Sequence, residues 1–312
     1  MTTFESFLSG TTTFDYVLQD QPYDAQIERA AALLSQADSV LIGAGSGMST
    51  AGGAQYGGEW FKKNFAEFQE RYGQGPYFSD MYAAGFYPFP SQEAFWGYWS
   101  KHALLGCIDL DTTPLHRKLL EAVGSDNYFV LTTNVDRQFE KAGVPQDKIF
   151  ATQGSYTHIQ CARGCHQKTY DATKLFLEMN ARRQGTEIPS ALVPHCPVCG
   201  GPMAMNLRQD NTFVEDDDWH RAEAAFSSFL DDALEGNLVL LEVGCGFNTP
   251  TIVRFPFEKL CRQHKNVHLI RLNLNEAIVP QSISAKSVCI NADMAKSITD
   301  LAEAVAERKS ES

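Results

Sequence analysis

Short apolar runs alternate with amphipathic segments along most of this 312-residue chain. Strands are predicted at 39–43, 127–133, 238–244 and 267–273, with a weaker one at 286–290. Helices are predicted at 24–38, 114–124, 251–265 and 294–308, where Asp24, Pro114 and Gly124 suit a helix start, a first turn and a stop. Parallel strands are joined by crossover helices, so this alternation predicts an α/β fold with a doubly wound parallel sheet.

Two segments interrupt the alternation of strands and helices. The aromatic-rich stretch from about 56 to 110 has no clear period, and we expect it to form helices and loops inserted over the sheet. Residues 157–211 carry two pairs of cysteines and are predicted to form a small zinc-binding module. The main domain is then expected to comprise residues 24–156 and 212–306.

The composition is that of a globular protein, with 44% hydrophobic and 21% charged residues and a formal net charge of -12. No cluster of Lys and Arg is present, so we expect no nucleic-acid partner. We find neither a secretory signal nor an apolar run of membrane-spanning length, which predicts a cytoplasmic protein. In a reducing cytosol, closely paired cysteines favour metal ligation over disulfide bonds.

The cysteine pattern predicts a structural zinc site. Cys161 and Cys165 are followed, after thirty residues, by Cys196 and Cys199. Four thiolates in a tetrahedron fill every coordination position and leave none for a reacting water. His166 and His195 are each adjacent to a cysteine of the set and are alternative ligands. The competing interpretation is four unconnected thiols.

Two glycine-rich segments directly follow predicted strands. In GAGSG (43–47), Gly43 and Gly45 would let a pyrophosphate approach the backbone, although a plain tight turn has the same pattern. Met48 occupies the third glycine position of a dehydrogenase fingerprint, which disfavours an ordinary dehydrogenase. The second segment is VGCGFNTP (243–250). Cys245 within it could be a nucleophile, but no histidine is near in sequence and a small buried thiol is favoured.

Polar side chains also follow two strand ends. Asn134 and Asp136, in TTNVDRQFEKAG (132–143), are expected at the carboxyl edge of the sheet, unless Asn134 merely caps the helix that follows. Gln153 follows the apolar run KIFAT, and its amide cannot accept a proton. It marks either an ordinary loop or an active site without a base. The run EDDDW (215–219) is interpreted as a solvated turn, in which Trp219 could pack on a partner.

Taken in order, these motifs resemble the sirtuin family over residues 24 to 306. The resemblance implies a Rossmann-like domain that binds NAD as a substrate, with a small structural zinc module. It implies that Asn134 and Asp136 hold the nicotinamide ribose and carboxamide, with Gln153 beside them as the third catalytic residue. The other residues expected to contact NAD are Gly43, Ala44, Gly45, Ser49, Tyr56, Gly244, Cys245, Gly246, Asn273 and Met294.

The chain departs from most sirtuins at two places. AQYGGEWF (54–61) replaces the usual Ile-Pro-Asp-Phe-Arg stretch, and Gln153 occupies the position of a histidine. Deacylating members need that histidine to deprotonate a ribose hydroxyl, which glutamine cannot do. Loss of nicotinamide, by contrast, needs no base. The resemblance therefore implies that deacylation is crippled while the NAD-cleaving step is retained.

Glutamine in place of histidine, together with the Tyr-Gly-Gly stretch, is similar to the class M sirtuins. That resemblance implies a protein mono-ADP-ribosyltransferase whose acceptor is a lipoylated glycine-cleavage H-like carrier, paired with a macrodomain that removes the mark. We expect the apolar slot for a lipoyl arm within the aromatic stretch 56–110. The alternatives are an NAD hydrolase, a weak deacylase in which His158 swings into the site, and an inactive NAD- or ADP-ribose-binding sensor.

Overall fold

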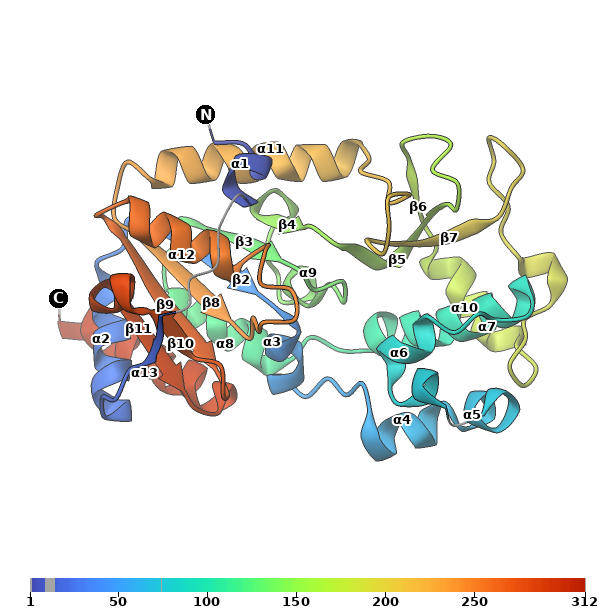
Figure 1. Ribbon diagram of the computed structural model, residues 1–312, viewed down its shortest axis with the longest axis horizontal. Helices are drawn as coiled ribbons and strands as arrows, with labels where there is room; N and C mark the ends of the chain where they lie inside the picture. The colour runs from blue at the N-terminus through green and yellow to red at the C-terminus, as the bar shows by residue number, and fades with distance from the viewer. Residues whose placement is uncertain (1, 9–14, 74, 312) are drawn as a thin grey trace.

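The computed structural model describes residues 2–8, 15–73 and 75–311. Its centre is a parallel sheet, as predicted, with six strands in the order β11-β9-β8-β2-β3-β4 (Figure 1). The strands are β2 (Ser39–Ala44), β3 (Tyr128–Thr132), β4 (Ile149–Ala151), β8 (Leu238–Val243), β9 (Val267–Asn273) and β11 (Ser287–Asn291). Later strands are added on opposite sides of β2, so the topological switch point lies between β2 and β8. Ligands of open α/β sheets bind at such a point.

Helices cover both faces of this sheet (Figure 1). On one face lie α2 (Tyr23–Ser35), α8 (Pro114–Val123) and α13 (Met294–Glu311), and on the other α1 (Phe4–Leu8), α11 (Asp217–Ala233) and α12 (Arg254–Gln263). Val40 and Ile42 of β2 belong to the first core, whereas Leu41 belongs to the second. A strand buried on both sides is apolar at every position, which explains why SVLIG is easily recognised in the sequence.

The helical insertion packs on the zinc module and not over the sheet, contrary to our expectation (Figure 1). It comprises α4 (Gly58–Asn64), α5 (Ala66–Tyr72), α6 (Met81–Gly85), α7 (Gln92–Ala103) and a π-helical turn (Leu104–Ile108). The module has α10 (Thr173–Arg182) and the antiparallel strands β5 (Gly154–Cys161), β6 (Thr169–Asp171) and β7 (Met203–Leu207). Phe61, Trp96, Cys161 and Phe176 share one buried cluster, so the two inserted segments form a second lobe.

The remaining elements are short. They are α3 (Ser46–Ala51), α9 (Gln138–Lys141), the antiparallel pair β1 (Tyr16–Leu18) and β10 (Ile278–Pro280), and 3-10 turns at Pro76–Phe78, Gln146–Lys148, Ser190–Leu192 and Gln281–Lys286. None of the helices within the described ranges is both long and apolar enough to cross a membrane.

Three local predictions were wrong. Helix α2 begins at Tyr23 after Pro22, so Asp24 lies in the first turn and is not the N-cap. Helix α12 begins only at Arg254, and residues 251–253 precede it. The run 215–219 is not a solvated turn, because Asp216 caps α11 by accepting a hydrogen bond from the Trp219 N–H at 3.1 Å. The Trp219 ring packs edge-on against Phe150, with centroids 4.9 Å apart.

Gly154 is the first residue of β5, shortly after β4 ends, and we predict that it tolerates no side chain. Its φ is +91°, and an added Cβ would lie 1.9 Å from the Asn206 carbonyl oxygen. Gly154→Ala should therefore lower the free energy of unfolding by roughly 3 kcal/mol, from backbone strain and overpacking together. Gly143 has a similar φ of +99° with no atom within 4 Å of an added Cβ. Gly143→Ala should lower the free energy of unfolding by only about 1 kcal/mol. Equal losses of unfolding free energy in the two variants, measured by urea unfolding, would contradict the prediction.

Candidate functional site

The glycine-rich loops after β2 and β8 contact each other at the switch point. The Gly47 N–H donates to the Gly244 carbonyl at 3.1 Å, and the Gly45 N–H donates to the Val243 carbonyl at 3.0 Å. Gly244 has a φ of +64°, and an added Cβ would lie 2.3 Å from the Met48 nitrogen. Glycine is therefore required here by the approach of the two loops to each other, a reason that the sequence did not reveal.

Asn134 lies at the end of β3 and is tied to the first glycine loop. Its side-chain Nδ2 donates to the Gly45 carbonyl at 3.0 Å and to Ser49 Oγ at 3.3 Å. Its own N–H donates to Thr132 Oγ1 at 3.0 Å. The residue does not cap α9, which begins after Arg137. The helix-cap alternative is excluded, and the Asn134 amide instead faces the loop at the carboxyl edge of the sheet.

Asp136 is a buried carboxylate that faces Ser49. Its Oδ2 accepts a hydrogen bond from Ser49 Oγ at 2.5 Å, and its Oδ1 accepts one from the Gln138 N–H at 3.2 Å. Burial raises the pKa of Asp136, and the Ser49 hydroxyl partly offsets that rise. Tyr56 interacts with the same serine, and burial raises the pKa of its hydroxyl. Asn134, Ser49, Asp136 and Tyr56 thus form one connected polar cluster.

Gln153 occupies the equivalent position beyond the neighbouring strand. Thr132 of β3 is paired with Ala151 of β4, and Asn134 and Gln153 each follow their partner by two residues. Gln153 is partly exposed, and its side-chain Nε2 donates to Thr152 Oγ1 at 3.2 Å. Its backbone carbonyl accepts a hydrogen bond from the backbone N–H of Arg208. The register therefore brings the amides of Asn134 and Gln153 to the same edge of the sheet.

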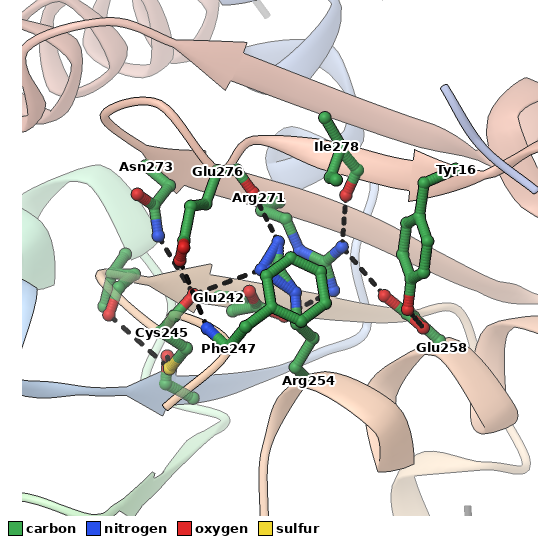
Figure 2. Close-up of polar contacts among 12 residues, drawn as sticks. Tyr16, Glu242, Cys245, Phe247, Arg254, Glu258, Arg271, Asn273, Glu276 and Ile278 are labelled. Atoms are coloured by element: carbon green, nitrogen blue, oxygen red, sulfur yellow. Dashed lines mark hydrogen bonds and ion pairs between the residues drawn. The ribbon is translucent and has the colours of Figure 1, made fainter. Parts of the chain in front are cut away.

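The other end of the candidate site lies after β8 and β9 (Figure 2). Asn273 is the last residue of β9, and its Nδ2 donates to the Cys245 carbonyl at 2.9 Å. The Cys245 thiol is buried 3.5 Å from the Gly43 carbonyl, and burial raises its pKa well above the usual range. A protonated, enclosed thiol is not a nucleophile, which agrees with the structural interpretation of Cys245.

Fully buried charges lie directly behind this loop (Figure 2). Arg271 forms ion pairs with Glu242 at 2.7 Å and Glu258 at 2.9 Å, and none of the three side chains is more than 2% exposed. Tyr16 donates to the second oxygen of Glu258 at 2.8 Å. A second fully buried arginine, Arg254, contacts the loop itself.

The remaining residues expected to contact NAD lie around the same edge. Gly43 and Ala44 end β2 and are buried, and an added Cβ at Gly43 would clash with Phe257. Gly246 is packed against the Glu276 carboxylate. Met294 begins α13 and is 6% exposed in the sheet core.

Several neighbours of these residues could not be identified from the sequence. Tyr82 lies with its ring 5.1 Å from that of Tyr56, and Tyr156 interacts with Tyr82 from the start of β5. Both belong to the second lobe, so only tertiary packing brings them here. Arg254 was placed in a helix, but the pattern gives no sign that a charged residue points into the core. Arg208, beside Gln153, lay in the segment assigned to the zinc module.

The four predicted zinc ligands converge in the second lobe. Their Sγ atoms all lie within 4.8 Å of one another, with Cys161–Cys199 at 3.7 Å and Cys165–Cys196 at 3.6 Å. A tetrahedral Zn–S distance of about 2.3 Å requires sulfur atoms roughly 3.8 Å apart, so the cluster fits zinc. His166 Nδ1 lies 3.1 Å from the Cys165 sulfur, but four thiols already complete the set. His195 is exposed.

Comparison with solved structures identifies the fold. A Sir2 homologue in complex with NAD superimposes with a TM-score of 0.61 at 16% identity, covering 96% of this chain and 99% of that one. A Sir2 homologue mutant in complex with ADP-ribose gives a TM-score of 0.57 at 14% identity, covering 91% and 98%. No protein-family model matches the sequence.

A curated relative from Staphylococcus aureus strain Mu50, named protein ADP-ribosyltransferase, is 31% identical over 284 residues, 91% of this chain and 88% of that protein. The chain belongs to the sirtuin family. This sirtuin is also 33% identical to a probable bifunctional ADP-ribose hydrolase/ADP-ribosyltransferase of Fusarium oxysporum f. sp. cubense. The match covers 86% of our sirtuin but only 46% of the fungal protein.

We predict that zinc contributes directly to the stability of this sirtuin. Cys161 and Cys107 are both buried in the core of the second lobe, but only Cys161 belongs to the four-thiol cluster. Cys161→Ser should therefore lose bound zinc and lower the melting temperature by several degrees, because metal binding contributes to folding. Cys107→Ser is the matched control and should retain one zinc per chain. Equal zinc contents by atomic absorption in the two variants would disprove the assignment.

Asp136 should make the protein less stable as the pH rises. Because its pKa is higher in the folded than in the unfolded protein, the folded state binds more protons in the window above the ordinary aspartate pKa. Asp136→Asn should therefore be more stable than wild type at pH 7, with the difference vanishing below about pH 4. The exposed Asp20→Asn variant should show no such difference. Urea unfolding across this pH range measures the difference in free energy of unfolding between variant and wild type. An Asp136→Asn variant that is less stable than wild type at pH 7 would contradict the prediction.

Proposed function

We propose that this protein transfers ADP-ribose from NAD to a side chain of an acceptor protein and releases nicotinamide. The bond between ribose C1′ and the nicotinamide nitrogen breaks, and its electron pair leaves with the nicotinamide. A carboxylate oxygen of the acceptor then forms an ester bond to the oxocarbenium-like C1′. The names of both curated relatives include ADP-ribosyltransferase, which supports this reaction class.

The polar cluster at the ends of β2 and β3 is proposed to hold the leaving-group half of NAD. In this assignment Asn134 and Asp136 contact the nicotinamide ribose and carboxamide, beside Ser49 and Tyr56. Hydrogen bonds from the Asn134 amide to the Gly45 carbonyl and to Ser49 of α3 orient this side chain, which supports the assignment.

The diphosphate half of NAD is proposed to lie across the two glycine loops. The backbone of Gly45 and Gly244 would face the phosphates, and Asn273 would approach the adenine ribose. The meeting of these loops at the topological switch point supports the assignment, because nucleotides bind there in open α/β sheets.

The observation that carries the proposal is Gln153 at the end of β4. An amide there can orient the ribose by hydrogen bonds but cannot take a proton from it. His158 lies on β5 with its Nδ1 3.0 Å from Thr157 Oγ1, and it lines a cavity of about 140 Å³ together with Asn134 and Asp136. The weak-deacylase alternative depends on this histidine, and the deacylation assay below tests it. An amide at the position of Gln153 favours capture by an ionised carboxylate, which needs no deprotonation.

We propose a lipoylated glycine-cleavage H-like carrier as the acceptor, with a macrodomain hydrolase as the opposing enzyme. Two exposed aromatic side chains support an apolar arm near the site: Tyr82 in α6 is 43% exposed and contacts Tyr56, and Phe86, directly after α6, is 63% exposed. The name of the fungal relative joins hydrolase and transferase in one protein, which supports the proposed pairing.

The test is incubation with NAD labelled in the adenylate phosphate. Parallel reactions contain the lipoylated carrier, the same carrier without lipoate, or no carrier. Label on the lipoylated carrier alone supports the full proposal, and label on both forms supports transfer without lipoyl recognition. Free ADP-ribose as the sole product would indicate an NAD hydrolase, whereas bound but unchanged NAD would indicate a sensor. Rapid removal of acetyl groups from lysine would contradict the proposed role of Gln153.

We predict that Asn134→Ala abolishes transfer and that Gln153→Ala reduces it strongly, at least about tenfold for one lost transition-state contact. Both variants should melt as cooperatively as wild type. The exposed Gln167→Ala variant is the control and should keep full activity. Initial rates of label transfer measure the effect, and undiminished rates in both variants would refute the site.

A further inference from the structure

A second buried arginine distinguishes the charge cluster behind the loop after β8 (Figure 2). Arg254 is fully buried at the start of α12. Its guanidinium donates to the Cys245 carbonyl at 3.4 Å and to the Glu276 carbonyl, and its Nε has no hydrogen-bond partner among the described residues. The Phe247 ring covers it, with the guanidinium carbon 4.1 Å from the ring centroid.

The two arginines of the cluster are paired differently. Arg271 contacts both buried carboxylates, Glu242 and Glu258. Arg254 forms no ion pair with any carboxylate in the described part of the chain and is left with carbonyl dipoles and an aromatic face. A buried charge without a paired counter-charge costs several kcal/mol of stability. The cluster of two arginines and two glutamates is balanced in formal charge, but the Arg254 guanidinium contacts neither carboxylate.

The position of Arg254 indicates what that charge acts on. The two carbonyls that it contacts belong to the loops after β8 and β9, and Cys245 also accepts the hydrogen bond from Asn273. A cation at this depth is weakly screened, because little water separates it from the loop surface. An anion on the outer side of the loop would be attracted through the backbone.

We propose that Arg254 is a positioning residue for the diphosphate of NAD, acting from behind the loop Gly244–Phe247. Its hydrogen bond holds the Cys245 carbonyl toward the protein interior. Its positive charge attracts the diphosphate from the other side of the loop, without direct contact with the nucleotide. The inference rests on the proposed use of NAD. It gives a physical reason for a buried arginine that contacts no carboxylate, because a bound diphosphate would place an anion on the far side of the loop that Arg254 contacts.

Arg254→Met tests this inference because it keeps an unbranched apolar stem and removes the charge. Without ligand, the variant should melt at or above the wild-type temperature, since replacing an unpaired buried charge by an apolar side chain is neutral or stabilising. Its affinities for NAD and ADP-ribose, measured by calorimetry, should fall at least tenfold, about 1.4 kcal/mol. Adenosine, which lacks phosphates, should stabilise both proteins equally in thermal-shift assays.

Arg271→Met is the contrasting control. It leaves Glu242 and Glu258 buried and unpaired, so it should lower the melting temperature of the ligand-free protein. If Arg254→Met also melts lower or fails to fold, Arg254 is structural and the inference is overturned. Undiminished NAD affinity in Arg254→Met overturns it as well, while wild-type binding leaves the proposed function intact. Failure of the wild-type protein to bind NAD would overturn both.

Discussion

The contact between the loops after β2 and β8 is the constraint on which the rest of the site depends. Gly47 and Gly244 approach so closely that no side chain fits between them. This contact places the Gly45 carbonyl where Asn134 can bind it and directs Ser49 toward Asp136. The candidate site is therefore assembled from loops that hold each other in place through their own backbone contacts.

Two polar groups of the candidate site, Asn134 and Gln153, are amides that cannot accept a proton. Asp136 is a buried carboxylate whose pKa is raised by burial and whose two oxygens accept hydrogen bonds from Ser49 and Gln138. His102 is enclosed in the aromatic core of the second lobe, where burial lowers its pKa to about 3. Such a site suits a reaction whose difficult step is the departure of a neutral leaving group. In the proposed reaction, the fate of the resulting electrophile then depends on which nucleophile is docked beside it.

The parallel sheet, the glycine loops and the zinc ligands could be predicted from the sequence because each depends on local patterns. SVLIG is apolar at every position, and the cysteines are closely spaced on both sides of their loop. The packing of the 56–110 insertion on the zinc module could not be predicted. Aromatic residues such as Phe61 and Trp96 predict burial but do not indicate which part of the protein they pack against. The burial of Arg254 was equally hidden. An arginine one turn before Glu258 looks like a solvated pair, whereas here Glu258 is paired with Arg271.

The shared core of the second lobe connects zinc to the chemistry of the site. Strand β5 runs from Gly154, next to Gln153, to the zinc ligand Cys161, and it contributes Tyr156 beside Tyr82. One end of this strand carries a thiol of the four-cysteine cluster, and the other follows β4 at the edge of the parallel sheet. A disturbance at the thiols would therefore reach Gln153 through a single eight-residue strand. A zinc ion held by the four thiolates would be structural in its coordination, yet it would help to hold in position Gln153, the side chain proposed to determine which reaction follows nicotinamide release.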